Sequence, residues 1–121
     1  MTMISRTLIR EQLGQWTAGR ISSLQMHQWA VELRSRSGLT FEDEEGPQAF
    51  SVARETLNEL DMLDMNLLTP ADIPVFQEFL STPPGRFESG YITFIGKLQA
   101  VNTEERKETL QNTEPYRKFC K

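Results

Sequence analysis

The sequence has little of the residue types that build disulfides, metal sites and nucleophilic active sites. It holds one cysteine, Cys120, and one histidine, His27, among 121 residues. A lone thiol cannot form an internal disulfide, which is typical of a reducing compartment. A zinc site or a catalytic triad needs a second histidine or thiol nearby. We therefore expect no bound metal, and we interpret His27 as a polar surface residue and Cys120 as an incidental thiol.

Long apolar runs and nucleotide-binding motifs are also missing. No stretch approaches the ~18 uninterrupted apolar residues that a membrane span requires, and Arg6 and Arg10 lie where a signal peptide would carry its apolar segment. We expect a cytoplasmic protein without membrane contact. The glycines form neither a Gly-x-Gly-x-x-Gly motif nor a phosphate loop, so we expect no cofactor.

Basic residues are scarce in the middle of the chain. Residues 37–80 carry one basic and ten acidic groups. By contrast, residues 1–36 carry five basic and two acidic groups, and residues 81–121 carry seven basic and five acidic groups. Nucleic acid is normally bound through Lys and Arg, so we expect no direct contact with it. The acidic block is either a solubility coat, which favours a monomer or weak dimer, or a surface for a basic partner.

The composition that remains is that of a folded protein, with 38% hydrophobic and 25% charged residues. A chain of 121 residues suits one hydrophobic core. We expect a single domain over residues 1–121, with its core at about 5–112 and a tail at 113–121 that packs back through Tyr116 and Phe119.

Apolar spacing predicts a helical hairpin at the start of the chain. The first helix is predicted from Ser5 to Ala18, and Gly19 suits its left-handed end. Ser22 and Gln25 predict a capping box for the second helix, which Gly38 ends. The predicted buried stripes of the hairpin are Leu8, Ile9, Leu13, Trp16, Met26, Trp29, Ala30 and Leu33.

The remaining segments are also predicted to be helical. An acidic loop, Thr40 to Gly46, precedes a third helix whose first turn holds Pro47. A fourth helix is expected from about Pro74 to Leu80, then a loop from Ser81 to Gly90. Residues 91–101 combine strand formers with a helical stripe, and we choose helix over strand.

A short last helix is expected at about 103–112. The fold class predicted is therefore all-α: an antiparallel bundle of about four main helices with one or two short additional C-terminal helices.

The third helix and the acidic loop supply the candidate binding residues. Phe50, Ala53, Leu57 and Leu60 share the expected buried face of this helix, which leaves the opposite face for a partner. The acidic run lacks the ligand spacing, the central Gly and the final Glu of an EF-hand, so we do not interpret it as a calcium loop. The predicted partner-binding residues are Glu42, Asp43, Glu44, Glu45, Glu55, Glu59 and Met62.

Three stretches of the chain share a pattern with a known group of proteins. They are Leu8-Ile9, Leu13, Trp16 and Gly19-Arg20-Ile21-Ser22 in the hairpin, the acidic run Glu42 to Glu45, and Leu57-Asn58-Glu59-Leu60-Asp61-Met62-Leu63. Over residues 5–82 the chain resembles the colicin-like immunity proteins of bacteria and their relatives in contact-dependent growth-inhibition systems. It departs from that pattern after Leu80, where a Pro-rich loop and a further segment extend the usual bundle.

The resemblance implies a helical bundle that binds a toxin domain, often a basic tRNA-cleaving nuclease, and covers its active site with acidic side chains in place of substrate phosphates. We therefore expect an immunity protein that neutralises a cognate bacterial toxin. The alternative is a helical adaptor or regulatory module unrelated to toxins. A third class, an enzyme that uses carboxylates, would need a pocket with at least two buried acids of perturbed pKa. We expect no catalysis.

Overall fold

The chain is mainly helical in a computed structural model that describes residues 2–120. None of its helices is long and apolar enough to cross a bilayer. The α-helices of the described part are α1 (Arg6–Thr17), α2 (Ser23–Ser35), α3 (Val52–Asp61), α4 (Ile73–Leu80), α5 (Phe87–Gln99) and α6 (Thr103–Leu110). The shorter elements are the strands β1 (Thr2–Ile4) and β2 (Leu39–Phe41) and the 3₁₀ helices η1 (Pro70–Asp72) and η2 (Arg117–Phe119).

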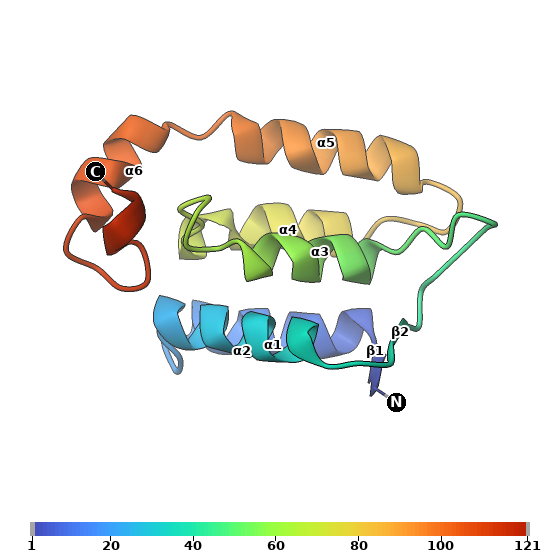
Figure 1. The fold of residues 1–121 in the computed structure, drawn as a ribbon. Coiled ribbons are helices and arrows are strands. Elements are labelled where there is room, and N and C mark those ends of the chain that lie inside the picture. The colour runs from blue at the N-terminus through green and yellow to red at the C-terminus, as the bar shows by residue number, and fades with distance from the viewer. Residues whose placement is uncertain (1, 121) are drawn as a thin grey trace.

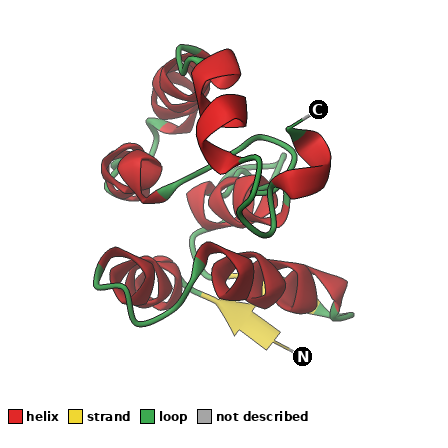
Figure 2. Ribbon diagram, turned by 90° about the vertical axis from the view of Figure 1, so that its left-hand side faces the viewer, coloured by secondary structure: helices red, strands yellow, loops and turns green. Residues whose placement is uncertain are grey.

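The helices lie in three tiers. Helices α1 and α2 form one outer tier, α3 and α4 form the middle tier, and α5 lies on the far side of the middle tier (Figure 1). Helix α6 and η2 both lie at one end of the stack (Figure 1), the end that faces the viewer in Figure 2. Because the middle tier is covered from two sides, its apolar residues Leu57, Leu60, Phe76 and Leu80 are fully buried.

A small parallel sheet joins the start of the chain to the segment after α2. Thr2, Met3 and Ile4 of β1 pair with Leu39, Thr40 and Phe41 of β2. The all-α prediction misses this sheet, and Thr40 and Phe41 belong to a strand instead of the predicted acidic loop. Strands of three residues are too short to show a period of two. Since Ile4 is fully buried, the core also begins before the predicted position 5.

The local signals in the first hairpin are confirmed. Ser22 Oγ accepts from the Gln25 N–H at 3.1 Å, and Gln25 Oε1 accepts from the Ser22 N–H at 2.8 Å, as a capping box requires. Gly19 has the expected left-handed φ of 74°. Six of the eight residues predicted for the two stripes are buried, and Leu8 and Trp29 pack against them half-buried.

Helix α3 begins later than predicted. Its N-cap is Ser51, whose hydroxyl accepts from the Arg54 N–H at 2.9 Å. Pro47 lies in a turn, because the chain reverses before Phe50 and pairs its backbone with that of Glu45. Phe50 therefore does not share the buried face of α3, and its ring stacks on Phe87 at 4.8 Å between centroids.

Helix α5 begins earlier than predicted, at Phe87, which shortens the preceding loop to residues 81–86. The helix prediction for residues 91–101 is confirmed as far as Gln99. Aromatic stacking explains the early start. The ring centroids of Phe87 and Tyr91 lie 5.5 Å apart, and those of Phe94 and of Phe79 on α4 lie 4.2 Å apart. These contacts favour continuing the helix through the glycine at position 90.

The end of the chain is tied to the core by two polar contacts. Arg106 of α6 donates to both carboxylate oxygens of the buried Asp72, at 2.6 and 3.0 Å, and the hydroxyl of Tyr116 donates to the Leu68 carbonyl. The predicted packing of Tyr116 and Phe119 is confirmed, since the first is buried and the second half-buried. The core thus extends beyond the predicted boundary at 112.

Two glycines inside helices should respond in opposite ways to substitution by alanine. A Cβ at Gly90 would lie 2.7 Å from Oγ1 of the buried Thr82, whereas one at Gly14 would meet nothing within 4 Å. Overpacking costs about 1–3 kcal/mol and the gain in helix propensity is ~1 kcal/mol, so Gly90→Ala should lower the unfolding free energy by about 1 kcal/mol. Gly14→Ala should raise it by about 0.5–1 kcal/mol.

Urea unfolding followed by circular dichroism measures both changes. Equal stabilisation by the two substitutions would contradict the close approach of α5 to Thr82.

Candidate binding site

The fold neutralises part of the acidic block. Four of its acidic side chains form ion pairs with Lys or Arg, and three of the four cations come from the outer thirds of the chain. The uneven charge distribution therefore serves folding as well as any partner. The pairs are Asp43–Arg6 at 2.8 Å, Glu44–Arg54 at 2.6 Å, Asp72–Arg106 at 2.6 Å and Glu78–Lys97 at 2.7 Å.

Asp43, a predicted binding residue, is engaged within the protein. Its carboxylate accepts hydrogen bonds from Arg6 Nε, the Ser51 hydroxyl and the Ala53 N–H. Burial raises the pKa of Asp43, but the hydrogen bonds from Ser51, Arg6 and Ala53 and the charge of Arg6 outweigh it, and the pKa is lowered overall. The carboxylate thus fixes the start of α3 against α1.

Two other members of the acidic run, Glu44 and Glu45, also make contacts within the protein. Glu44 pairs with Arg54, and the Glu45 carboxylate accepts from the Gly85 N–H at 3.1 and 3.2 Å. Glu42 is exposed. Of the four predicted residues in this run, only Glu42 is an exposed carboxylate without a hydrogen bond or ion pair in the described part of the chain.

Glu55 and Glu59 lie one helical turn apart on α3. The sequence predicted that they face open solvent, and they do not. Both are half-buried, and both lie near enough to Tyr91 of α5 for their charges to act on its hydroxyl. Burial raises the pKa of Tyr91 on α5, and the charges of Glu55 and Glu59 raise it further. The prediction of an outer face is wrong because α3 lies in the middle tier, with helices on two sides.

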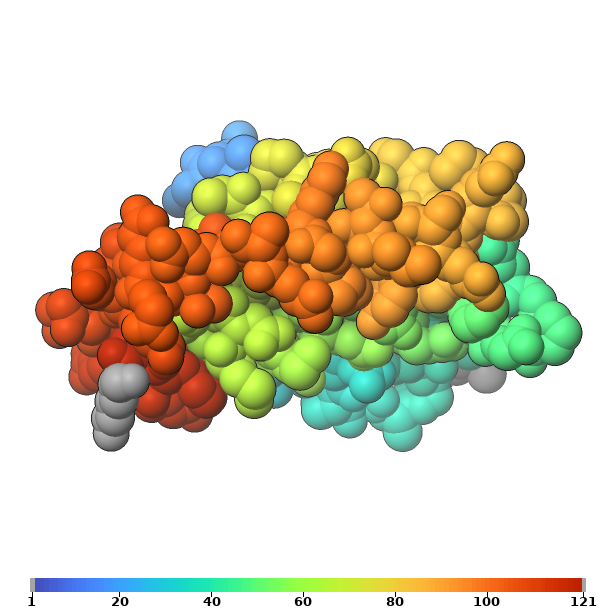
Figure 3. All heavy atoms as spheres, turned by 90° about the horizontal axis from the view of Figure 1, so that it is seen from above, coloured from blue at the N-terminus to red at the C-terminus, as the bar shows by residue number. Residues whose placement is uncertain are grey.

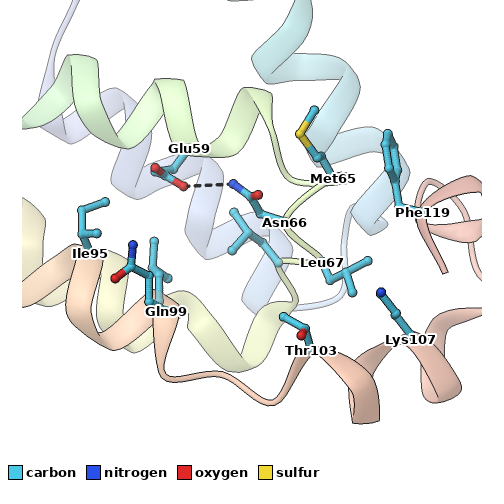
Figure 4. Close-up of a pocket in the computed structure, with 11 residues that line it drawn as sticks. Glu59, Met65, Asn66, Leu67, Ile95, Gln99, Thr103, Lys107 and Phe119 are labelled. Atoms are coloured by element: carbon cyan, nitrogen blue, oxygen red, sulfur yellow. Dashed lines mark hydrogen bonds between the residues drawn. The ribbon is translucent and has the colours of Figure 1, made fainter.

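A groove of about 510 Å³ opens beside Glu59, between the end of α3, the turn that follows it, α5, α6 and η2 (Figure 4). Seen from the side of α5, the chain around residues 60–68 lies next to α5 and α6 (Figure 3). Six of the eleven lining residues are apolar, and the five polar ones come from α3, the turn, α5 and α6. The lining residues are Glu59, Met65, Asn66, Leu67, Leu68, Ile95, Leu98, Gln99, Thr103, Lys107 and Phe119.

Glu59 has no neutralising cation in the part of the chain that the structure describes. Its partner is the Asn66 side chain, whose Nδ2 donates to Oε2 at 3.4 Å. Burial raises the pKa of Glu59, the Asn66 hydrogen bond lowers it, and the charge of Glu55 raises it again, so that the pKa lies above its ordinary value. Within residues 2–120, no Lys or Arg forms an ion pair with Glu55 or Glu59. Lys107, across the groove, pairs with Glu104 at 3.5 Å.

The predicted residues therefore fall into two groups at opposite ends of α3 (Figure 1). Residues 42–45 lie near its start and Glu55 lies in its first turn, while Glu59 and Met62 lie at its end, where Met62 is the half-buried C-cap. Met62 does not line the groove. Met65 does, and it is 56% exposed. It lies outside the helical stripe used for the prediction, and the sequence offers no periodic signal for it.

His27 is not the surface residue that was predicted. It is half-buried, with Nε2 3.0 Å from the Asp61 carbonyl and 3.4 Å from Asp64 Oδ1. The imidazole thus connects α2 to the turn after α3. Among the described residues, no three His, Cys, Asp or Glu side chains are grouped closely enough to hold a metal ion.

Comparisons with protein families, with curated proteins and with solved structures find no match to this chain.

Asp43→Asn should destabilise the protein at neutral pH. The substitution removes the charge that Arg6 needs, and a hydrogen bond to a charged group contributes about 2 kcal/mol. Because the folded-state pKa of Asp43 lies below its ordinary value of 3.8, its stabilisation is present above that pH and is lost as the pH falls further. Unfolding free energies at pH 7 and pH 3 measure this; a gap between wild type and variant that does not shrink at pH 3 would contradict the assignment.

Glu59→Gln should have the opposite effect on stability. Because the folded-state pKa of Glu59 is raised, its charged form disfavours the folded state, and the protein loses stability as the pH rises through that pKa. The variant should therefore unfold at higher urea concentration than wild type at pH 7 and match it at acidic pH, where both side chains are neutral. Glu42→Gln, at an exposed site, is the control with no change. A loss of stability in Glu59→Gln at pH 7 would refute this description of the groove.

Proposed function

We propose that this chain is a cytoplasmic immunity protein, which binds a basic toxin domain and blocks its active site. The observation that carries the proposal is the pair Glu55 and Glu59, two carboxylates without a Lys or Arg partner in the described structure, one of which lines an apolar groove. The proposal includes an antiparallel arrangement in which the helices act as one bundle.

The chemistry of this region suits a tight complex with a basic protein. Apolar contacts in a desolvated pocket contribute most of the affinity at protein interfaces, while complementary charge raises the association rate and the specificity. The groove offers both kinds of contact beside each other.

The alternatives from the sequence remain distinguishable from this proposal. A helical adaptor would bind another cytoplasmic protein through the same surface, and identification of the proteins retained by the tagged chain from native cells separates the two. An enzyme that uses carboxylates would need two perturbed acids in one pocket. The groove is lined by one Asp or Glu among the described residues, Glu59.

Co-expression with the toxin domain encoded beside this chain tests the proposal. We expect growth to be rescued and a complex to be seen by gel filtration at micromolar concentration. Failure of both would remove the immunity assignment.

Charge reversal then locates the surface. Glu55→Lys with Glu59→Lys should slow association and make the remaining binding more sensitive to salt, because it replaces the attraction for a basic partner by repulsion, and such forces act over about 8 Å at physiological ionic strength. Leu57→Ala is the matched folding control, which should cost about 2–5 kcal/mol of stability by leaving a cavity. Unchanged association of a folded double variant would show that the negative charges are only a solubility coat.

A further inference from the structure

We propose that the groove beside Glu59 receives one arginine side chain of the partner, with the guanidinium on the Glu59 carboxylate and the aliphatic stem along the apolar walls. This inference rests on the proposed function, because it assigns a particular contact to the basic partner.

The layout of the groove fits a long cationic side chain. Such a side chain has an apolar stem and a charged end, and it is bound best where both find a match. Ile95 and Leu98 of α5 and Met65 of the turn supply the apolar wall, and Glu59 lies at the α3 end of the same space (Figure 4). Met65 is unbranched and adaptable, so it can close over the stem.

The electrostatics of the groove favour a cation over a neutral or anionic ligand. Glu59 is partly removed from water, is accompanied by the like charge of Glu55, and makes a single long hydrogen bond to Asn66 within the described structure. A guanidinium placed there would neutralise a carboxylate that pairs with no Lys or Arg among residues 2–120. Arginine suits this position better than lysine, since its planar group can form two parallel hydrogen bonds to one carboxylate.

Lys107 limits the groove to one cation and gives the bound segment a direction. It lies on α6, across the groove from Glu59. A second basic residue at that end would be repelled. The volume of about 510 Å³ is in the range of ligand pockets and exceeds a single side chain, so the apolar neighbours of the arginine also enter.

A pair of short peptides tests the proposal without knowledge of the toxin. The probes are acetyl-Leu-Arg-Leu-amide and the same peptide with neutral citrulline in place of arginine, titrated into the labelled full chain and followed by NMR. We expect shifts of backbone amides around the groove, and affinity for the arginine peptide at least about tenfold higher, as one charged hydrogen bond would give. In addition, the arginine peptide should lower the pKa of Glu59 measured from its carboxyl carbon.

Two variants make the result decisive. Glu59→Gln should remove the preference for arginine, and Glu42→Gln should keep it. Equal affinity for the two peptides, shifts located elsewhere, or no groove shifts at about 10 mM peptide would overturn the proposal. A toxin complex whose affinity is unchanged by Glu59→Gln would also overturn it while leaving the immunity function intact. Arginine-selective binding without any toxin complex would instead remove the immunity function alone.

Discussion

The placement of α1 against the middle tier depends on the Arg6 guanidinium. It donates to Asp43 Oδ2 at 2.8 Å, to the Leu80 carbonyl at 2.9 Å and to the Thr82 carbonyl at 2.7 Å. One side chain of α1 therefore holds the start of α3 and closes the end of α4, where carbonyl groups have no partner within the helix.

The carboxylates of Asp43 and Glu59 have opposite effects on the stability of the fold. The Asp43 carboxylate has a cation and several donors, and its charge strengthens the folded state. The Glu59 carboxylate has no cation within residues 2–120, and its charge weakens the folded state. The stability of the fold does not explain why a glutamate occupies position 59. Side chains that lower stability in this way are typical of functional sites.

Local features were predictable from the sequence, and long-range ones were not. The capping box of Ser22 and Gln25 and the helix over 91–99 depend on residues within a few positions of each other. The role of Asp43 depends on Arg6, 37 positions away, which no spacing rule indicates. Likewise, the half-buried setting of Glu59 arises because α5 lies across the groove from the end of α3, whereas one apolar stripe predicts a single buried face for each helix.

The Arg6 contacts have a consequence for protein synthesis. The carbonyl acceptors at Leu80 and Thr82 are 74 and 76 positions downstream of Arg6. At ~5–20 residues per second, a ribosome needs roughly 4–15 s to add that length of chain. During this interval the nascent hairpin of α1 and α2 exposes apolar stripes that α3 and α4 later cover. The contacts of Arg6 with the end of α4 therefore form late, and the apolar stripes of the early hairpin are available to a chaperone until then.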